Sequence, residues 1–454
     1  MLKKNGVYQL LISEQGKTGD GIAMMDDRRI YVPNCIPGDR VELKVLKLEK
    51  RRAYGKLLRI IDSSDDRVTP RCDVASQCGG CQLQHQSQDA QIEFKQQLMR
   101  SRLGRFIELD DRVVLPMVAA KNQYEFRNKM QFAFGDKDGQ LQIGLYAPRS
   151  HRVVDTDYCS IMTPEMNQLF TIIRDWYQES PVPIFDEVNN VGILRYLTIR
   201  YAQNTNQLMV IITAAQSFDT ESLIDSLSQC FELQVLYLAI QSNPNSDSVI
   251  GDSFDCIWQR NNTYDGQIMD TIFGLRCLVS PRTFLQGNAT MVDTLYQTLL
   301  DHLDIQPGPV LDLYCGAGIL TMALSKIADT ILGVDDNSSA IADARKNALL
   351  NDCDIEFVCD KAEHFLANYD CSQATVIRDP PRQGCHPAVL SATQKHDLEM
   401  ARKLTMILSS ERASNYNDWL DVGYCLHGIS PDLLQTWIAF SKKWSMWNDD
   451  TECN

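Results

Sequence analysis

Apolar and polar residues alternate over residues 1–61 in the way that half-buried β-strands require. The strand-like runs are Val7–Ile12, Arg29–Pro33, Val41–Val45 and Tyr54–Leu58. A turn that contains glycine, Gly16–Gly21, separates the first two runs. Short strands joined by tight turns are typical of small closed sheets, so we predict an OB-like β-barrel in this part of the chain.

The middle of the chain, residues 110–270, follows a helical segment that we expect over Gln91–Arg105. Its strand-like runs are Met130–Phe134, Gln142–Tyr146, Arg195–Tyr201 and Leu208–Thr213. These alternating runs predict a module of the α+β class.

A strand, a glycine turn and a helix follow one another in the stretch Pro309–Thr321. Val310–Leu313 is a short apolar run that predicts a buried strand. Gly316 and Gly318 then permit a tight turn in which the backbone can approach a ligand closely. A helix is expected directly after the turn. This order predicts a ligand site at the carboxyl end of a parallel sheet in an α/β domain.

Carboxylates follow each of the next three strand-like runs: Asp335 after Ile331–Val334, Asp360 after Ile355–Val358, and Asp379 after Thr375–Ile377. Acidic residues at successive strand ends suit an adenosine-type ligand, because a carboxylate can accept hydrogen bonds from a ribose diol. The glycine spacing lacks the fuller dinucleotide pattern, which favours S-adenosylmethionine over NAD. The segment resembles the class I, Rossmann-like methyltransferases.

Charge is uneven along the 454 residues. The whole chain carries a formal net charge of -15, which argues against a general coating of nucleic acid. Residues 1–60 nevertheless hold 13 Lys and Arg against 7 Asp and Glu, a net charge of +6. A basic N-terminal segment on an otherwise acidic chain indicates that contact with a polyanion is confined to that segment.

No stretch of 18 uncharged apolar residues and no secretory-type leader occurs in the sequence. We therefore expect a soluble, cytoplasmic protein without a membrane partner. The sequence has 15 cysteines. In such a protein, clustered cysteines more often bind a metal or take part in catalysis than form disulfides.

Three cysteines, Cys72, Cys78 and Cys81, follow one another with five and then two residues between them. Cys159 lies 78 residues beyond Cys81. Four thiolates suit either an iron–sulfur cluster or structural zinc. Zinc sites more often use two paired Cys-x-x-Cys units, so three cysteines together with a distant fourth favour a cluster.

The cysteine pattern continues into Gln82–His85 and resembles that of the RNA uracil-5-methyltransferase family. The segment Val32–Asp39 is similar to part of the TRAM domain found on RNA-modifying enzymes. The resemblance implies a 4Fe-4S cluster held by the four cysteines and S-adenosylmethionine as cofactor. It also implies that the protein acts on ribosomal or transfer RNA, and we expect a monomer. The implied domains are a TRAM-like barrel (1–61), a cluster segment (62–109), a central RNA-binding region (110–270) and a methyltransferase domain (271–454).

The same resemblance carries cofactor-binding roles onto individual residues of this chain. Gln286 lies in the segment Ser280–Asn288, which is similar to the motif that precedes the family's methyltransferase domain. The implied cofactor-binding residues are Gln286, Tyr314, Gly316, Ile319, Asp335, Asp360 and Asp379. Ile319 departs from the family, in which a polar Asn is common, and Asp335 is shorter than the usual Glu.

The implied chemistry is covalent, because C5 of a neutral uracil ring is not nucleophilic. In the family, a cysteine thiolate adds to C6, and a carboxylate later removes the C5 proton. Ser410 stands at the position of that nucleophile, and Ala439 and Ser441 replace the His and Glu of the base step. Asp379 is retained and is assigned to the catalytic site as well. Cys385 is a candidate for a relocated nucleophile.

Three hypotheses follow from these departures. The chain is an active uracil-5-methyltransferase with shifted catalytic residues, a catalytically silent relative that binds RNA, or a methyltransferase that acts on a different RNA atom. Loss of both the cysteine and the glutamate favours the second and third hypotheses, and all three allow the cofactor to bind.

Overall fold

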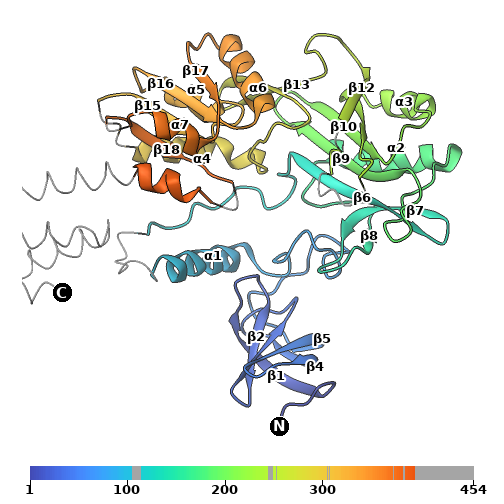
Figure 1. Ribbon diagram of the computed structural model, residues 1–454. Coiled ribbons are helices and arrows are strands. Elements are labelled where there is room, and N and C mark those ends of the chain that lie inside the picture. Colours follow the sequence, from blue (N-terminus) through green and yellow to red (C-terminus); the bar gives the residue numbers. More distant parts are fainter. Residues whose placement is uncertain are drawn as a thin grey trace, which may run out of the picture.

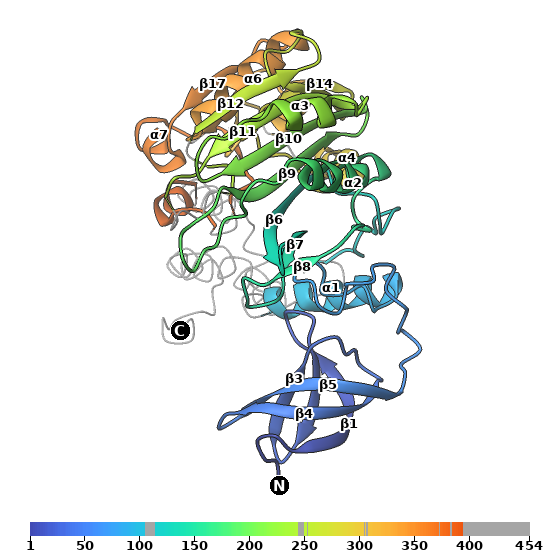
Figure 2. The ribbon, with the colours of Figure 1, turned by 90° about the vertical axis from the view of Figure 1, so that its right-hand side faces the viewer.

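The structure is a computed structural model, and it describes residues 1–104, 114–243, 249–251, 253–303, 305, 307–371, 373–381 and 384–393. The β-barrel lies at one end of the molecule, and a long helix lies between it and two larger α/β units (Figures 1 and 2). Among the described residues, no helix is both long and apolar enough to span a membrane.

The N-terminal segment forms a closed five-stranded barrel, which confirms the sequence prediction. Its strands are β1 (Val7–Gln15), β2 (Gly21–Met25), β3 (Arg28–Val32), β4 (Arg40–Leu48) and β5 (Arg52–Asp62), in the order β1-β2-β3-β5-β4. Alternate apolar side chains fill its interior, where Ile12, Ile30 and Leu43 are fully buried. The opposite positions face solvent and carry most of the barrel's charge.

Helix α1 (Gln88–Leu103) begins three residues before the predicted start. The reason is a cap, because the hydroxyl of Ser87 accepts a hydrogen bond of 3.3 Å from the backbone N–H of Ala90. No residue of α1 is fully buried. One face is held by the segment around residues 115–120, since the Gln96 amide donates to the Leu115 carbonyl and accepts from the Met117 N–H.

The central region is a seven-stranded sheet in the order β12-β11-β10-β9-β6-β7-β8, which confirms the α+β prediction. Its strands are β6 (Lys129–Lys137), β7 (Gln140–Tyr146), β8 (Val153–Asp155), β9 (Leu194–Ala202), β10 (Gln207–Ala214), β11 (Leu233–Ile240) and β12 (Ser253–Gln259). Helices α2 (Pro164–Glu179) and α3 (Glu221–Ser228) contribute to its main core, which includes Phe132, Phe170 and Trp176.

A hairpin of β13 (Ile268–Ile272) and β14 (Leu275–Val279), a 3-10 turn η1 (Ala289–Met291) and α4 (Val292–His302) lead into the C-terminal α/β domain. That domain alternates β15 (Val310–Leu313), α5 (Ile319–Leu324), β16 (Ile331–Asp335), α6 (Ser338–Leu350), β17 (Glu356–Cys359), α7 (Ala362–Asn368) and β18 (Thr375–Arg378). The four strands are parallel, in the order β17-β16-β15-β18. Their carboxyl ends therefore share one edge, as the sequence predicted.

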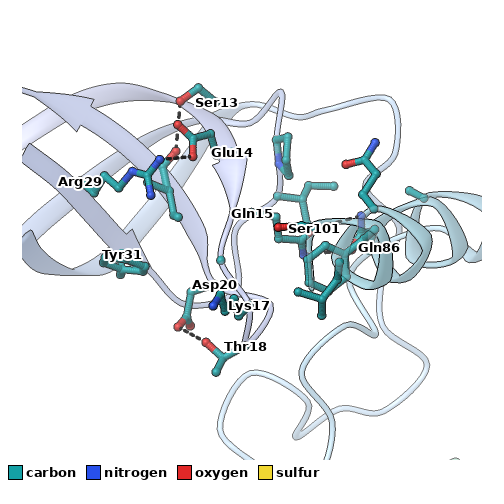
Figure 3. A pocket seen from close by; sticks show the side chains of 18 of the residues that line it. Ser13, Glu14, Gln15, Lys17, Thr18, Asp20, Arg29, Tyr31, Gln86 and Ser101 are labelled. Carbon is teal, nitrogen blue, oxygen red and sulfur yellow. Dashed lines mark hydrogen bonds and ion pairs between the residues drawn. The ribbon is translucent and has the colours of Figure 1, made fainter. Parts of the chain in front are cut away.

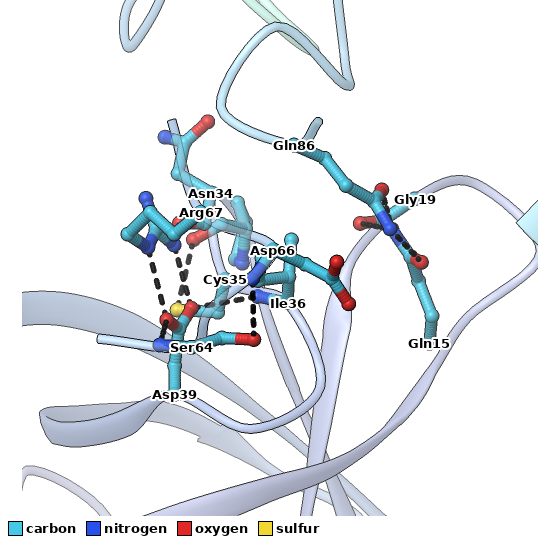
Figure 4. Close-up of polar contacts among 11 residues, drawn as sticks. Gln15, Gly19, Asn34, Cys35, Ile36, Asp39, Ser64, Asp66, Arg67 and Gln86 are labelled. Atoms are coloured by element: carbon cyan, nitrogen blue, oxygen red, sulfur yellow. Dashed lines mark hydrogen bonds and ion pairs between the residues drawn. The ribbon is translucent and has the colours of Figure 1, made fainter. Parts of the chain in front are cut away.

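A buried ion pair attaches the barrel to the segment that carries the clustered cysteines (Figure 4). The fully buried carboxylate of Asp39 accepts hydrogen bonds of 2.9 and 2.6 Å from the guanidinium of Arg67. Arg67 also donates to the Asn34 carbonyl, and the Asn34 amide donates to the Ser76 carbonyl. Ser76 lies between Cys72 and Cys78, so the cysteine segment is tied directly to the barrel.

Candidate functional site

The predicted ligand site forms where the strands β15, β16 and β18 end. The backbone N–H of Gly316 donates a hydrogen bond of 2.9 Å to the carboxylate of Asp335, at the end of β16. On the other side, the amide of Gln286 donates a hydrogen bond of 3.3 Å to the carboxylate of Asp379, just after β18. Residues far apart in the sequence thus meet around the glycine turn.

Glycine is needed at the second position of this turn for two reasons. Gly318 has a φ of 77°, in the left-handed region that residues with a Cβ rarely adopt. A Cβ added there would also lie 2.8 Å from the ring of Phe357 on β17. The turn therefore lets α5 start close against the sheet, immediately after the candidate site.

Two cavities meet at this edge of the sheet, and Tyr314 lines both. The smaller cavity has a volume of about 90 Å³, and its lining includes Gln286, Gly316, Ile319 and Asp379. The larger has a volume of about 410 Å³, and its lining includes Asp335, Asp336, Lys361, Glu363 and Cys385. Only the larger volume is within the range typical of small-molecule sites, so a cofactor with two halves would have to occupy both cavities.

A loop between the central sheet and the C-terminal domain holds Gln286 in place. Arg200 on β9 is fully buried, and its guanidinium donates to the carbonyls of Ser280, Pro281 and Thr283. From the other side, Asp343 on α6 accepts hydrogen bonds from the hydroxyls of Ser280 and Thr283. Residues of both the central sheet and the C-terminal domain hydrogen-bond to this loop. The position of Gln286 therefore depends on how these two units are placed relative to each other.

Asp312 is a buried carboxyl directly beneath the candidate site. It is 1% exposed and also lines the smaller cavity. Burial raises its pKa to about 7, the hydroxyl of Thr321 lowers it through a hydrogen bond of 2.6 Å, and the charges of Asp379 and Asp335 raise it further. The C-terminal domain therefore contains a carboxyl that gains or loses its proton near neutral pH.

The other sequence-assigned cofactor residues occupy less central positions. Ile319 is buried at the start of α5, with its side chain against the smaller cavity. The carboxylate of Asp360 accepts a hydrogen bond from the N–H of Lys361 and lies 3.7 Å from His364. Cys385 is half-buried beside Tyr314, whose pKa is raised by burial and by the neighbouring thiol. Their predicted roles stay predictions.

The four assigned cysteines come together at a separate place, between the barrel and the central sheet. Cys72, Cys78, Cys81 and Cys159 line one cavity, although the fourth belongs to a different segment. Its other walls are largely apolar and include Val74, Ala75, Phe132, Leu145 and Ile161. The free volume between these side chains is about 20 Å³, so the thiols would have to separate to admit a cluster.

Hydrogen-bond donors already point at three of these sulfur atoms. The backbone N–H of Gly80 donates to the sulfur of Cys78 at 3.4 Å. The side chain of Gln84 donates to Cys81, and the N–H of Ile161 donates to Cys159. Burial raises the pKa of these three thiols, and the donors partly offset it, so a bound metal would supply the remaining stabilisation of the thiolates. The described residues contain no group of three or more His, Cys, Asp or Glu arranged to hold a metal ion.

Three buried residues of the site were not predicted from the sequence. Asp312, Arg200 and Asp343 were not predicted, although each has an ionisable side chain that is nearly completely buried. For Asp312 and Arg200 a signal was available, because each interrupts a strand of otherwise mostly apolar residues. Asp343 lies in a helix of mixed composition and gave no such signal. The nucleophile and base positions, Ser410 and Ser441, lie outside the described residues.

Two relatives are similar to this chain over most of its length. A Clostridium tetani protein named as an uncharacterized RNA methyltransferase is 33% identical, and the match covers 87% of this chain and 86% of the relative. A relative with the same description from Halalkalibacterium halodurans is 32% identical, with 96% of each chain covered. This chain belongs to the RNA methyltransferase family.

The family models agree with this assignment at both ends of the fold. The TRAM domain model matches residues 3–58, which form the barrel, and the methyltransferase small domain model matches residues 288–403. A third model, primase C terminal 2, matches residues 401–454. Ser410 and Ser441 fall within that last range.

A solved structure with a similar fold is that of the Pyrococcus abyssi tRNA (uracil-54, C5)-methyltransferase in complex with S-adenosyl-L-homocysteine. It superimposes with a TM-score of 0.68 and 24% sequence identity, over 86% of this chain and 87% of that chain. The fold of this RNA methyltransferase therefore extends over most of the chain, with a class I methyltransferase domain and an N-terminal barrel.

Proposed function

We propose that this RNA methyltransferase uses S-adenosylmethionine and that its target is C5 of uracil in a ribosomal or transfer RNA. The observation that carries the proposal is the pair of cavities that have Tyr314 in both of their walls. Asp335, in the larger cavity, would accept hydrogen bonds from the ribose hydroxyls. Gln286 and Asp379, already joined to each other, would line the other half of the site. When bound, the cofactor supplies an activated methyl group.

We also propose that Cys72, Cys78, Cys81 and Cys159 hold a 4Fe-4S cluster. Support comes from the four thiols in one largely apolar cavity and from the hydrogen-bond donors aimed at three of their sulfur atoms. The purified protein should be brown, absorb at roughly 400 nm and contain about four irons per chain. A colourless protein with stoichiometric zinc would overturn the assignment.

The identity of the nucleophile separates the candidate mechanisms. Ser410 is a weak candidate, because a serine hydroxyl needs a strong base to become an alkoxide near neutral pH. Cys385 lies in the cavity that also contains Asp335, which favours contact with the nucleoside half of the cofactor over attack on uracil. The sequence therefore offers a candidate cofactor site but no obvious nucleophile that could add to C6 of uracil.

A second candidate function follows from the match of residues 401–454 to the primase C terminal 2 model. This range contains the positions at which the resemblance expects the nucleophile and the base. If these residues descend from a different family, the protein would bind RNA and cofactor without forming 5-methyluridine. It would then be a silent relative or a methyltransferase for another RNA atom.

The experiment that tests both candidates is incubation of the purified protein with methyl-labelled S-adenosylmethionine and unmodified total RNA, followed by nucleoside analysis. Label in 5-methyluridine would support the proposal, and label in another nucleoside would redirect it. Absence of label, with cofactor binding retained in calorimetry, would support the silent relative. The variant Asp379→Asn should lose labelling, whereas Asp329→Asn, an exposed carboxylate on the same domain, should retain it.

A further inference from the structure

The loop that carries Gln286 lies between the central sheet and the C-terminal domain, and these two units bind different parts of it. The central sheet binds the backbone of the loop. From β9, the guanidinium of Arg200 donates hydrogen bonds of 2.7, 2.9 and 2.5 Å to the carbonyls of Ser280, Pro281 and Thr283. These bonds fix the main chain at the start of the loop.

The end of the loop is held in the same way, from the segment that leads into β6. Asn128 is 7% exposed, and its side-chain amide donates a hydrogen bond of 2.8 Å to the carbonyl of Gln286. Its backbone N–H donates a second bond, of 3.3 Å, to the carbonyl of Gly287. The central unit therefore holds the main chain both before and at Gln286.

The C-terminal domain binds side chains of the same loop. The carboxylate of Asp343 on α6 accepts hydrogen bonds from the hydroxyls of Ser280, at 2.6 Å, and Thr283. Just after β18, the carboxylate of Asp379 accepts a hydrogen bond of 3.3 Å from the Gln286 amide. The loop is thus a layer between the two units, and separation of the units breaks one of the two sets of bonds.

Two buried charges face the loop from opposite sides. Arg200 and Asp343 are each 3% exposed. Burial lowers the pKa of Arg200 to about 10, and the charge of Asp343 partly offsets this, so the guanidinium stays charged at neutral pH. A buried charge is costly unless hydrogen bonds and an opposite charge stabilise it. Displacement of the loop would remove such bonds from both residues, which makes its position well defined.

We propose that this loop couples the cofactor site to the joint between the central sheet and the C-terminal domain, with Arg200 and Asp343 as positioning residues. Neither residue lines the two cavities, so both act through the loop. Cofactor binding then tightens the joint, and loosening of the joint weakens cofactor binding, because one coupling free energy governs both effects. The inference rests on the proposed cofactor site and adds residues outside it that set its affinity.

The test is a double-mutant cycle on binding of S-adenosylmethionine, measured by calorimetry with the full-length protein and no RNA. Arg200→Met and Gln286→Ala should each weaken binding about tenfold, because both lose the hydrogen bond that Gln286 offers the cofactor. The double variant should bind about as tightly as Gln286→Ala alone. If Arg200 only supported the fold, the two factors would multiply to about a hundredfold, since a smaller binding-competent fraction weakens every variant alike.

Arg195→Met is the matched control. Arg195 lies on the same strand and is 4% exposed, and its guanidinium donates to the carbonyl of Gln241. Cofactor affinity should stay that of the unaltered protein. If Arg200→Met does not fold, Thr283→Val tests the loop from the other side, because it keeps the carbonyl bound to Arg200 and removes the hydroxyl bound to Asp343. It should also weaken binding and add nothing to Gln286→Ala.

Hydrogen exchange gives the reciprocal measurement. Cofactor binding should slow exchange of the β9 amides in the unaltered protein, and this effect should be lost in Arg200→Met. Strand β1 of the barrel is the internal reference. A cleft of about 1310 Å³ lies between the barrel and α1 (Figure 3), where the side chain of Gln15 donates a hydrogen bond of 3.1 Å to that of Gln86. The barrel is therefore separate from the joint, and exchange of β1 should not change.

The inference is overturned if Arg200→Met binds the cofactor as tightly as the unaltered protein, if the two factors multiply, or if the cofactor leaves β9 exchange unchanged. If the unaltered protein does not bind S-adenosylmethionine, the proposed cofactor site fails and the inference fails with it. Failure of the inference alone leaves binding by the unaltered protein intact, so the two results are distinguishable.

Discussion

Replacement of Asp312 by Asn should change how the stability of the C-terminal domain depends on pH. The Asp312 carboxyl is buried against the smaller of the two cavities at the candidate site, with a pKa of about 7 in the folded protein against 3.8 for an ordinary aspartate. Between these two values the folded state keeps a proton that the unfolded state has lost. Stability must therefore fall as pH rises from about 4 to about 7, and then level off.

The size of the effect follows from the shift in pKa. One pKa unit corresponds to about 1.4 kcal/mol, so a shift of about three units gives up to about 4 kcal/mol at pH 8. Asn has nearly the same shape as Asp and can still accept the hydrogen bond from Thr321 through its carbonyl oxygen. Asp312→Asn should therefore resemble the unaltered protein at pH 4.5 and be more stable than it at pH 8.

A chain with several domains does not unfold in a single step, so a local probe is needed. Native-state hydrogen exchange of the β15 amides, corrected for the intrinsic effect of pH, reports opening of this domain. The measured quantity is the difference in opening free energy between Asp312→Asn and the unaltered protein. A difference that stays constant between pH 4.5 and pH 8 would refute the argument, because it would mean that the buried carboxyl has an ordinary pKa.

Three further predictions concern other parts of the molecule. Gln286→Ala should weaken binding of S-adenosylmethionine in calorimetry by about tenfold or more, since one hydrogen bond to a charged group contributes about 1.5–3 kcal/mol; unchanged affinity would remove Gln286 from the site. Arg67→Ala should destabilise the barrel in thermal unfolding by about 3–5 kcal/mol, because Asp39 would stay buried without its cation, and an unshifted melting curve would contradict this. Cys159→Ala should lower the iron content and the visible absorbance of the purified protein, whereas Cys230→Ala, a buried cysteine elsewhere, should leave both unchanged.

Local patterns predicted the barrel and the parallel sheet well, because each strand shows its buried face in its own sequence. The glycine turn and the carboxylates at the strand ends were found in the same way. The central sheet was predicted only in part: β8 has three residues, and β11 is an almost wholly apolar run that shows no alternation. The start of α1 was missed because it depends on a single capping hydroxyl, that of Ser87.

Contacts between distant segments could not be predicted from such patterns. Nothing near Arg200 in the sequence indicates that its guanidinium would hold the loop before Gln286, since the two are about 80 residues apart along the chain. The convergence of Cys159 with the other three cysteines was inferred from a family resemblance, and the structure provides the shared cavity. The cleft between the barrel and α1 depends on how two elements are placed, and no sequence motif encodes that placement.

The ion pair between Asp39 and Arg67 limits where the chain can be cut to give a stable N-terminal fragment. A fragment that ended at residue 61 would retain the barrel strands except for the last residue of β5, but it would leave the fully buried Asp39 carboxylate without its guanidinium. It would also lose His85, whose ring is buried against the barrel and hydrogen-bonds the Cys35 backbone. We therefore expect a fragment that extends through Gln86 to be more stable than one that ends at residue 61. In this protein the barrel and the start of the cysteine segment would then unfold together.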